Sequence, residues 1–343
     1  MCWLGSLYRS LLLMMDSLLS QSSELGSWIK TELAQVVDVI QSTLKNDCDA
    51  VNELCTQVLR YQGKMLRPSL LFMSWKSVCT NESNIEDVRK AAAVFELIHL
   101  ATLVHDDVLD EAALRRGGHT ISYLQGNEMA VMLGDYLLSS AYHLCSTIGN
   151  PELNVLLGEI TTTVCSGEIS QLSHRDNLKL TQDEYYTIIK NKTAVLIAGC
   201  CLVGAKLGGG TDSQVEALRG FGERLGVAFQ VRDDLLDLMC STSSIGKPSQ
   251  RDFEKGKPTL PLILYLNNHK EAFEDVCQEF ESGSFHAMYD RLSQSGCIEQ
   301  SSQYIETLVR DAQSLLRAAV SNDVAEQLCG LSEHLNNPIE AAT

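Results

Sequence analysis

Two short acidic segments hold the side chains in this sequence that are best suited to chemistry. HDDVLD at 105–110 places Asp106, Asp107 and Asp110 at positions i, i+1 and i+4, and RDDLLD at 232–237 repeats this spacing. On a helix of 3.6 residues per turn, such positions lie within about 100° of one another and share a face. Carboxylates this close repel one another and are poorly solvated inside an apolar helix, so they need a cation.

The cation that these carboxylates predict is Mg²⁺. Hard oxygen ligands suit it, and it usually completes its shell with waters and with phosphate oxygens of a substrate. A single DDxxD segment could equally be a solvated acidic face. Because Asp233, Asp234 and Asp237 repeat the first cluster inside a second apolar helix, that alternative is weak. The two clusters are therefore predicted to form two walls of one site.

Basic residues occur where the phosphate groups of such a substrate would need them. Arg115 and Arg116 follow the first cluster, and guanidinium groups form forked hydrogen bonds with phosphate. A lone histidine in an apolar helix is usually a core residue, but His99 lies seven residues before Asp106 and faces the same way, which favours a phosphate contact. Further candidates are Lys64, Arg67, Lys192, Thr193, Lys247 and Lys257. Together they predict a cavity for two phosphorylated substrates.

Composition restricts the classes of protein to which this chain could belong. It has 343 residues and a formal net charge of −17, with 45% hydrophobic residues and only six prolines. It has no run of Lys and Arg, and non-specific nucleic-acid binding needs a basic patch, so no nucleic-acid partner is expected. A small anionic substrate remains compatible, because bound divalent cations invert the local field.

Neither the cysteines nor the N-terminus indicates secretion or membrane insertion. The twelve cysteines include no CxxC pair and no zinc-ligand spacing, which is typical of buried small side chains in a reducing cytosol. In MCWLGSLYRSLLLMMDSLLS, Asp16 interrupts the apolar run after about five residues, too few for a signal sequence or a membrane span. We therefore expect a soluble, cytoplasmic protein without a transmembrane segment.

Long segments that lack a strand pattern predict helix after helix. Residues 89–115 contain no Gly or Pro, and the centre of the segment is apolar on nearly all sides, which indicates a helix buried in a bundle. Further helices are expected at 129–146, 151–172, 182–206, 212–239, 258–267 and 301–320. No tract is long and polar enough for an interdomain linker. The prediction is one all-α domain over 31–343, preceded by an N-terminal extension or first helix at 1–30.

The motifs around these residues resemble those of the trans-isoprenyl (polyprenyl) diphosphate synthase family. The resemblance covers residues 60–265 and rests on GKMLRP, ELIHLATLVHDDVLDEAALRRG, GDYLLS, GEISQ, KNKTA, FGERLGVAFQVRDDLLD and GKPSQRDFEKGKPTLP, in that order. It implies the isoprenoid synthase fold, a large single-domain helical bundle around a deep central cavity, normally a homodimer. It also implies that Mg²⁺ draws the diphosphate off an allylic substrate and that isopentenyl diphosphate attacks the resulting carbocation head-to-tail.

Carried over by position, the resemblance assigns a role to each candidate residue. Three Mg²⁺ ions would be held by Asp106, Asp110, Asp233 and Asp237, with catalytic support from Asp107, Asp234 and Lys192. The allylic diphosphate would contact Arg115, Lys192, Thr193, Gln230, Lys247 and Lys257. Isopentenyl diphosphate would contact Lys64, Arg67, His99 and Arg116. The sequence departs from the family pattern at Met65, Arg232 and Gln250, and none of these departures removes a ligand.

Residues before the first cluster predict the length of the product. Thr102 lies one turn below Asp106 on nearly the same face, whereas Ala101 is implicated by the family resemblance alone. Both side chains are small. The next bulky ones, Ile98 and Phe95, lie about 12 Å and 16.5 Å along the axis from Asp106 at 1.5 Å per residue. We therefore expect a medium- to long-chain product, geranylgeranyl diphosphate or longer.

Two other functions compete with this prediction. A non-catalytic subunit of a heteromeric polyprenyl diphosphate synthase would typically have lost an aspartate cluster, and both clusters are intact here. A class I terpene cyclase usually carries one aspartate-rich motif and an NSE-type triad, whereas RDDLLD stands at the second position in this chain. The sequence favours the synthase.

Overall fold

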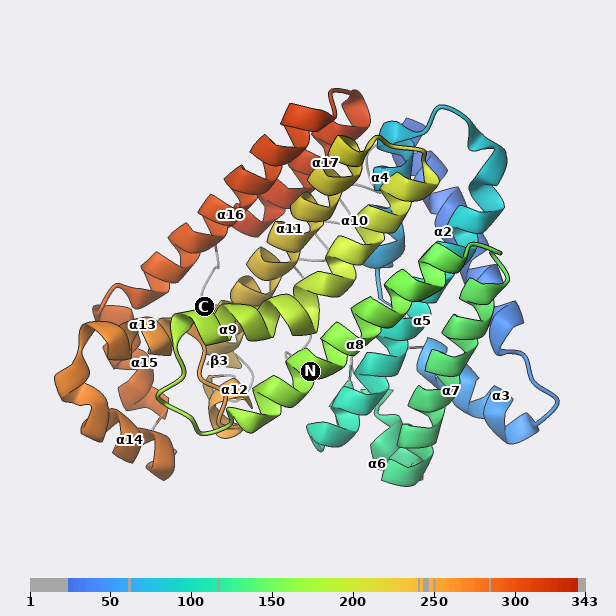
Figure 1. Ribbon diagram of the computed structural model, residues 1–343. Coiled ribbons are helices and arrows are strands. Elements are labelled where there is room, and N and C mark those ends of the chain that lie inside the picture. The colour runs from blue at the N-terminus through green and yellow to red at the C-terminus, as the bar shows by residue number, and fades with distance from the viewer. Residues whose placement is uncertain are drawn as a thin grey trace.

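Long helices lie side by side in a bundle (Figure 1). The computed structural model describes residues 24–60, 63–115, 118–239, 241–242, 247–248, 251–283 and 285–338. Its helices are α2 (Glu24–Leu44), α3 (Asp49–Leu59), α4 (Leu66–Val78), α5 (Ile85–Leu109), α6 (Ile121–Gln125), α7 (Asn127–Ser146), α8 (Pro151–Ser173), α9 (Gln182–Ile189), α10 (Val195–Leu207), α11 (Asp212–Met239), α12 (Arg251–Glu254), α13 (Leu260–Asn268), α14 (Phe273–Ser282), α15 (Phe285–Gln294), α16 (Cys297–Ala319) and α17 (Asp323–Glu333). The expected all-α class is confirmed.

Short elements connect some of these helices. Two antiparallel hairpins are formed by β1 (Leu114–Arg115) with β2 (Gly118–His119) and by β3 (Ser241–Thr242) with β4 (Lys247–Pro248). A π-helical turn, η2 (Lys190–Ala194), joins α9 to α10. Since α2 runs through residue 30 and residues 1–23 lie outside the described ranges, a division of the chain at residue 30 stays a prediction.

The helix expected at 89–115 is too long at its C-terminal end, where the first hairpin begins. The helix α5 ends at Leu109, and Glu111 has a φ of 47°, in the left-handed region. A residue in the left-handed conformation cannot continue a right-handed helix, so the chain turns there. Arg115 consequently lies on strand β1 instead of ending the acidic helix.

Local signals explain where the helices beside the site begin. At α8 the Asn150 side chain accepts the Glu152 N–H, and Pro151 occupies the first turn, where a missing N–H costs nothing. At α9, Thr181 and Glu184 form a capping box, in which each side chain accepts the other's backbone N–H. Both starts satisfy backbone donors that would otherwise lack a partner.

The centre of the bundle is built around α5 and α10. Between Ala91 and Ala101, α5 is buried on nearly all sides, and it packs against α2, α4, α7 and α10. The helix α10 lies against α4 and α11, and α11 in turn packs on α16. The continuous segment Gln182–Leu207 has the length and the mean hydropathy, 1.5, of a membrane span, but 67% of its most apolar window is buried. That burial is typical of a core helix.

Candidate active site

The first acidic cluster lies at the C-terminal end of α5, where cations meet it. The Asp107 carboxylate is buried and accepts a 2.8 Å hydrogen bond from Nε of Arg115 on β1. Burial, together with the charges of Glu168 and Asp110, raises the pKa of Asp106 to about 6, although Lys192 and Arg115 act in the opposite direction. This part of the site therefore combines acids with their counterions.

Asp110 is the most strongly paired member of that cluster. Its Oδ1 lies 2.7 Å from Nζ of Lys255 and 3.7 Å from Nη2 of Arg175. Burial alone would raise the pKa of Asp110, but the charges of Lys257, Lys255 and Lys192 together outweigh burial and lower it. Asp110 therefore stays ionised at neutral pH.

The second acidic cluster lies near the C-terminal end of α11 and has a different environment. Burial and repulsion by Asp234, Asp252 and Asp237 raise the pKa of Asp233 well above its ordinary value. Burial and the charge of Asp252 raise the pKa of Asp234 to about 7. Asp237 accepts the backbone N–H of Asp252 at 3.0 Å. Four carboxylates thus gather around this helix end.

Asp252 and Lys257 connect the two clusters, whose helices both end toward the lower side of Figure 1, near α12. Burial and the charges of Asp237 and Asp110 raise the pKa of Asp252 to about 6, so acids of both clusters act on this carboxyl. Burial lowers the pKa of Lys257, but Asp252 and Asp110 contribute to a larger opposing effect and the pKa is raised. Its Nζ lies 3.7 Å from Asp252. The structure therefore brings the two predicted walls together.

A chain of neutral donors holds the second cluster. The Thr193 hydroxyl donates to Oε1 of Gln230 at 2.9 Å, and Nε2 of Gln230 donates to Oδ1 of Asp234 at 2.9 Å. On the other side, the hydroxyl of buried Tyr185 donates to Oδ2 of Asp234 at 2.5 Å. Thr193 and Gln230, both expected at the allylic diphosphate, are thus beside the second cluster.

Two glycines allow the KNKTA turn to reach this position. A Cβ on Gly167 of α8 would lie 2.4 Å from the backbone N of Lys192, and one on Gly226 of α11 would lie 2.5 Å from Cα of Ala194. The π-helical turn is therefore fitted between α8 and α11 at backbone contact. It directs the Lys192 ammonium to Glu168, with which it forms an ion pair, and to Gln171 at 2.6 Å.

The residues expected at isopentenyl diphosphate lie at the start of α4 and on α5. Met65 precedes α4 with a φ of 56°, and such strained backbone is often found at binding sites. Burial lowers the pKa of Arg67, an effect opposed by Glu96, and its Nε has no hydrogen-bond partner among the described residues. Lys64 and His99 are half-buried. Arg116 lies outside the described ranges.

The remaining candidates divide between the core and a less fully described loop. Ala101, Ile98 and Phe95 are buried, whereas Thr102 is half-buried and donates its hydroxyl to the His99 carbonyl at 2.8 Å. Lys247 lies on β4, and its side chain is not among those described. Its contact with the allylic diphosphate stays a prediction.

Sequence reasoning missed several side chains that the fold brings to the site. Asp252 and Lys255 lie inside the motif at 246–261, and Glu168 and Gln171 lie inside GEISQ, but only their positions in the fold reveal their partners. No local signal could have found Tyr185 or Arg175, because their partners, Asp234 and Asp110, lie many residues away in the sequence.

The donor set fits a divalent cation. Asp233, Asp234 and Asp252 are buried carboxyls whose pKa values are raised by burial and mutual repulsion, and a bound cation would relieve both effects. Within the described part of the chain, no group of three or more His, Cys, Asp or Glu side chains could hold an ion alone. An ion here would take further ligands from water and substrate, as Mg²⁺ usually does.

Comparisons with known proteins agree with this geometry. The chain is 30% identical over 311 residues to heptaprenyl diphosphate synthase component 2 of Geobacillus stearothermophilus, covering 90% of this chain and 96% of that protein. It is 29% identical over 306 residues to octaprenyl diphosphate synthase of Escherichia coli, covering 88% and 94% respectively.

Solved structures show the same fold. A decaprenyl diphosphate synthase from Rhodobacter capsulatus matches with a TM-score of 0.85 and 28% identity, covering 94% of this chain and 98% of that one. A polyprenyl synthase from Caulobacter crescentus, complexed with calcium and isoprenyl diphosphate, matches with a TM-score of 0.81 and 29% identity, covering 92% and 97%. A model of the polyprenyl synthetase family matches residues 48–290. This chain therefore belongs to the polyprenyl synthetase family, which confirms the family and the prenyltransferase class expected from its motifs.

Proposed function

We propose that this protein condenses isopentenyl diphosphate head-to-tail onto an allylic diphosphate and releases a medium- to long-chain polyprenyl diphosphate. The observation that carries the proposal is the convergence of both aspartate clusters on Lys257 and Asp252. A class I terpene cyclase is disfavoured, because the second wall is a full DDxxD cluster.

Asp106, Asp110, Asp233 and Asp237 would hold the metal, with three Mg²⁺ ions as the expected number. Bound Mg²⁺ supplies positive charge that stabilises a departing diphosphate. The chain's own cations add to this effect in a site that burial shields from water.

The protein side chains have separate tasks at the two substrates. Lys192 is held against α8 by Glu168 and Gln171, so its ammonium is positioned before a diphosphate arrives. Arg115, Thr193, Gln230, Lys247 and Lys257 would complete the allylic diphosphate site. Lys64, Arg67, His99 and Arg116 would bind isopentenyl diphosphate. The buried Nε of Arg67, which has no hydrogen-bond partner in the described part of the chain, supports this role.

The test is an assay of the purified chain alone, with labelled isopentenyl diphosphate, Mg²⁺ and several allylic primers. We expect chain elongation that stops when Mg²⁺ is removed with EDTA and resumes when it is restored. An intact, folded chain that is inactive alone but active with a second subunit would support the non-catalytic or heteromeric alternative instead.

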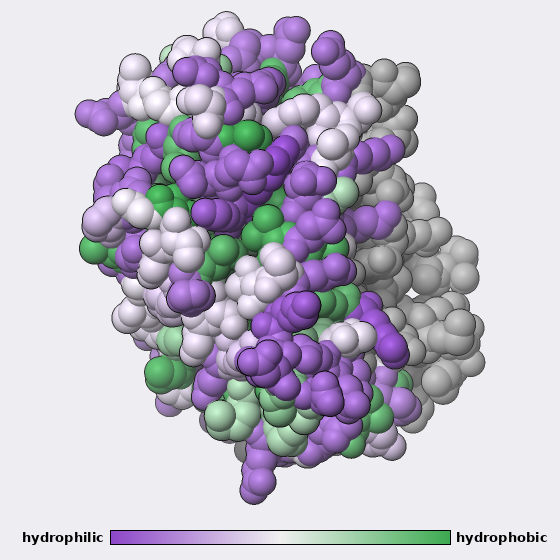
Figure 2. All heavy atoms as spheres, turned by 90° about the vertical axis from the view of Figure 1, so that its right-hand side faces the viewer, coloured by the Kyte–Doolittle hydropathy of each residue, from purple (hydrophilic) through white to green (hydrophobic). Residues whose placement is uncertain are grey.

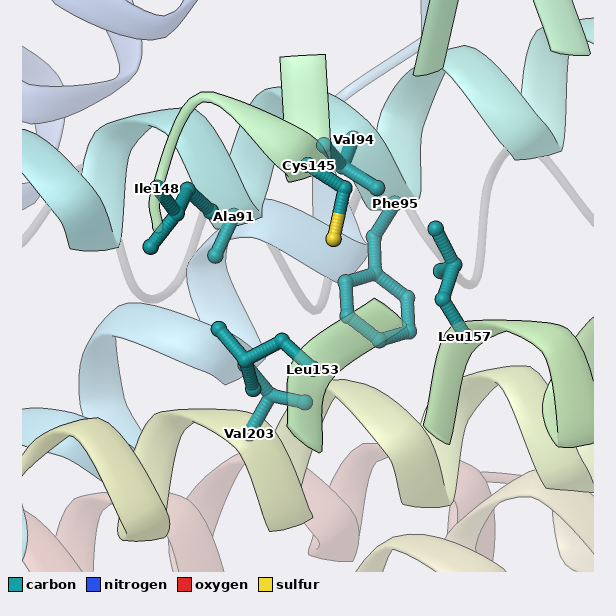
Figure 3. A pocket seen from close by; sticks show the side chains of 8 residues that line it. All are labelled: Ala91, Val94, Phe95, Cys145, Ile148, Leu153, Leu157 and Val203. Atoms are coloured by element: carbon teal, nitrogen blue, oxygen red, sulfur yellow. The ribbon is translucent and has the colours of Figure 1, made fainter. Parts of the chain in front are cut away.

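The apolar region below the first cluster supports a product of geranylgeranyl length or longer. Phe95 lines a small apolar cavity between α5, α7, α8 and α10, and Figure 3 shows its ring among Cys145, Leu153 and Leu157. A Cβ on Gly199 would lie 3.0 Å from the Phe95 ring, so this glycine makes room for it. Thr102 and Ala101, between Asp106 and Phe95, have small side chains, so a growing chain would pass along α5 there toward Phe95.

Product chromatography tests this length. The side chains that limit how far the growing chain extends below Asp106 form the floor of its cavity. Ala101→Phe and Thr102→Phe should raise this floor and shorten the product, and Phe95→Ala should lengthen it. Farnesyl diphosphate as the wild-type end product, or unchanged products from the two phenylalanine variants, would contradict the assignment of the floor.

We further propose that the protein is a homodimer joined through α7 and α8. Exposed apolar side chains concentrate on these helices, among them Met132 (63% exposed), Val155 (62%) and Ile169 (67%). Figure 2 looks onto the side of the bundle on which α3 and α7 lie in Figure 1, and it shows several hydrophobic areas among hydrophilic side chains. Exposed apolar groups that gather on one surface mark contacts between proteins.

Sedimentation velocity tests the dimer. The wild type should sediment as a dimer, and Met132→Lys should dissociate it, while Gln303→Lys on α16 should have no effect. A monomeric wild type, or a dimer that Met132→Lys leaves intact, would exclude this interface. A relative's designation as component 2 makes a heteromeric assembly the competing outcome.

A cytoplasmic location is proposed as well. All ten described cysteines are free thiols, which supports a reducing compartment. Cell fractionation with an antibody against the protein tests it, and recovery in a membrane or secreted fraction would contradict it.

A further inference from the structure

Two cations that the motif pattern did not single out converge on Asp110. Nζ of Lys255 lies 2.7 Å from Oδ1 of Asp110 and also donates to the Asp110 carbonyl at 3.0 Å. Nη2 of Arg175 approaches the same Oδ1 to 3.7 Å. Both side chains are partly buried, with 21% of Lys255 and 34% of Arg175 exposed. The end of the first wall is thus tied to two distant turns of the chain.

These two turns are docked against each other, which fixes where their cations lie. The Asp176 N–H donates to the Gly256 carbonyl at 2.7 Å. Gly256 has a φ of 67°, and a Cβ there would lie 2.0 Å from Oδ1 of Asp176. Only glycine fits this position, so Arg175 and Lys255, which flank the contact, are presented together to the end of α5.

The same oxygen cannot serve an ammonium and a metal ion equally well. A carboxylate that ligates Mg²⁺ directs its lone pairs to the ion, and the positive charges of the ion and of Lys255 repel each other. An uncompensated charge in a partly buried place costs free energy, so an ammonium that loses its partner favours binding another anion. An arriving diphosphate is the anion that comes with the metal.

We propose that Lys255, supported by Arg175, changes partner during substrate binding. In the metal-free site it neutralises Asp110, and in the loaded site it binds an oxygen of the allylic diphosphate. This inference rests on the proposed role of Asp110 as a metal ligand. It makes Lys255 a further residue that binds the diphosphate, and it predicts opposite effects on metal binding and on diphosphate binding when the charge is removed.

The experiment compares Lys255→Met with Lys270→Met, which removes the same charge from an exposed position on the 3₁₀ turn after α13. Mn²⁺ alone serves as the metal probe, and its free concentration is followed by electron paramagnetic resonance. Inorganic pyrophosphate, titrated calorimetrically in the presence of Mg²⁺, serves as the anion probe. Lys255→Met should bind Mn²⁺ several-fold more tightly and pyrophosphate about tenfold more weakly or worse. Lys270→Met should match the wild type.

Two further variants separate the possible failures. Lys255→Arg should restore pyrophosphate binding, and circular dichroism checks that each variant is folded. Unchanged pyrophosphate binding in folded Lys255→Met, or Mn²⁺ binding that becomes weaker, would overturn the exchange of partners. Asp110→Asn should weaken Mn²⁺ binding. If it does not, the proposed metal site itself is wrong.

Discussion

The two aspartate clusters have the same spacing in the sequence and opposite surroundings in the fold. Arg115 and Lys255 bind Asp107 and Asp110 directly at the end of α5. At the end of α11, the donors that the structure shows to the acids are a tyrosine hydroxyl, a glutamine amide and a backbone N–H. Asp107 and Asp110 are therefore paired with cations of the chain, whereas Asp234 and Asp237 are held by neutral donors.

This difference teaches that a motif does not determine the charge state of its residues. The pKa of Asp110 is lowered while those of Asp233 and Asp234 are raised, although each residue belongs to a DDxxD segment. At Asp110 the charges of three lysines outweigh burial, whereas at Asp106, Asp233 and Asp234 burial prevails. Metal binding should accordingly change the second wall more than the first.

The largest expected effect comes from removing one acid from each wall. Asp106→Ala and Asp233→Ala should each reduce turnover on the order of a thousandfold or more, because both remove a ligand to the charge that stabilises the leaving group. Steady-state kinetics with saturating Mg²⁺ measures this, with circular dichroism to show that the fold is kept. Near-normal turnover in either variant would show that the walls do not share one reaction.

Next in size is the loss of a cation from the first wall. Arg115→Ala should raise the Michaelis constant for the allylic substrate by an amount that corresponds to about 1.5–3 kcal/mol, the value of a charged hydrogen bond. The Michaelis constant for isopentenyl diphosphate should change little, whereas Arg116→Ala should show the reverse pattern. Equal effects on both substrates would mean that the arginines do not divide between them.

Without metal, the free energy of unfolding should change in opposite directions when an acid is replaced in the first wall and in the second. Asp110→Asn breaks a partly exposed ion pair and should lower the free energy of unfolding by about 1–2 kcal/mol. Asp233→Asn removes a repelled buried charge and should raise it. Denaturant unfolding in EDTA measures both. A loss of stability in both variants would show that the second wall is neutralised after all.

The last effect is gradual and concerns pH. The pKa of Asp234 is about 7 in the folded protein, against about 4 in an unfolded chain. Because the folded pKa is raised, the folded state binds the proton more tightly, so this stabilisation is full below about pH 4 and is lost as pH rises through about 7.

Metal-free wild type should consequently lose stability relative to Asp234→Asn between about pH 4 and pH 7, by at most about 1.4 kcal/mol per pH unit. Parallel unfolding series of the two proteins measure the difference. If the free energy of unfolding changes with pH equally in both proteins, the pKa of Asp234 is not raised. Other groups would then offset the effects of burial and of Asp252.

Much of the fold could be predicted because helix formation depends on residues that are close together in the sequence. The apolar centre of α5, the start of α8 at Asn150 and the end of α7 at IGNP follow from neighbours within a few positions. The helix predicted at 89–115 was too long, because the chain turns after Leu109. Glu111 adopts a left-handed conformation that ends α5 early, and nothing in the apolar period of that helix marks the position.

The sequence by itself determined the helical class, the two acidic faces and the family, because residue spacing fixes which side chains share a face of a helix. Only the tertiary structure decided the partners. Lys255 meets Asp110 across 145 residues, and Lys192 reaches its place because Gly167 and Gly226 let two helices touch the π-helical turn. Burial and the distance between charges far apart in the chain set each pKa. Neither quantity exists until the helices pack.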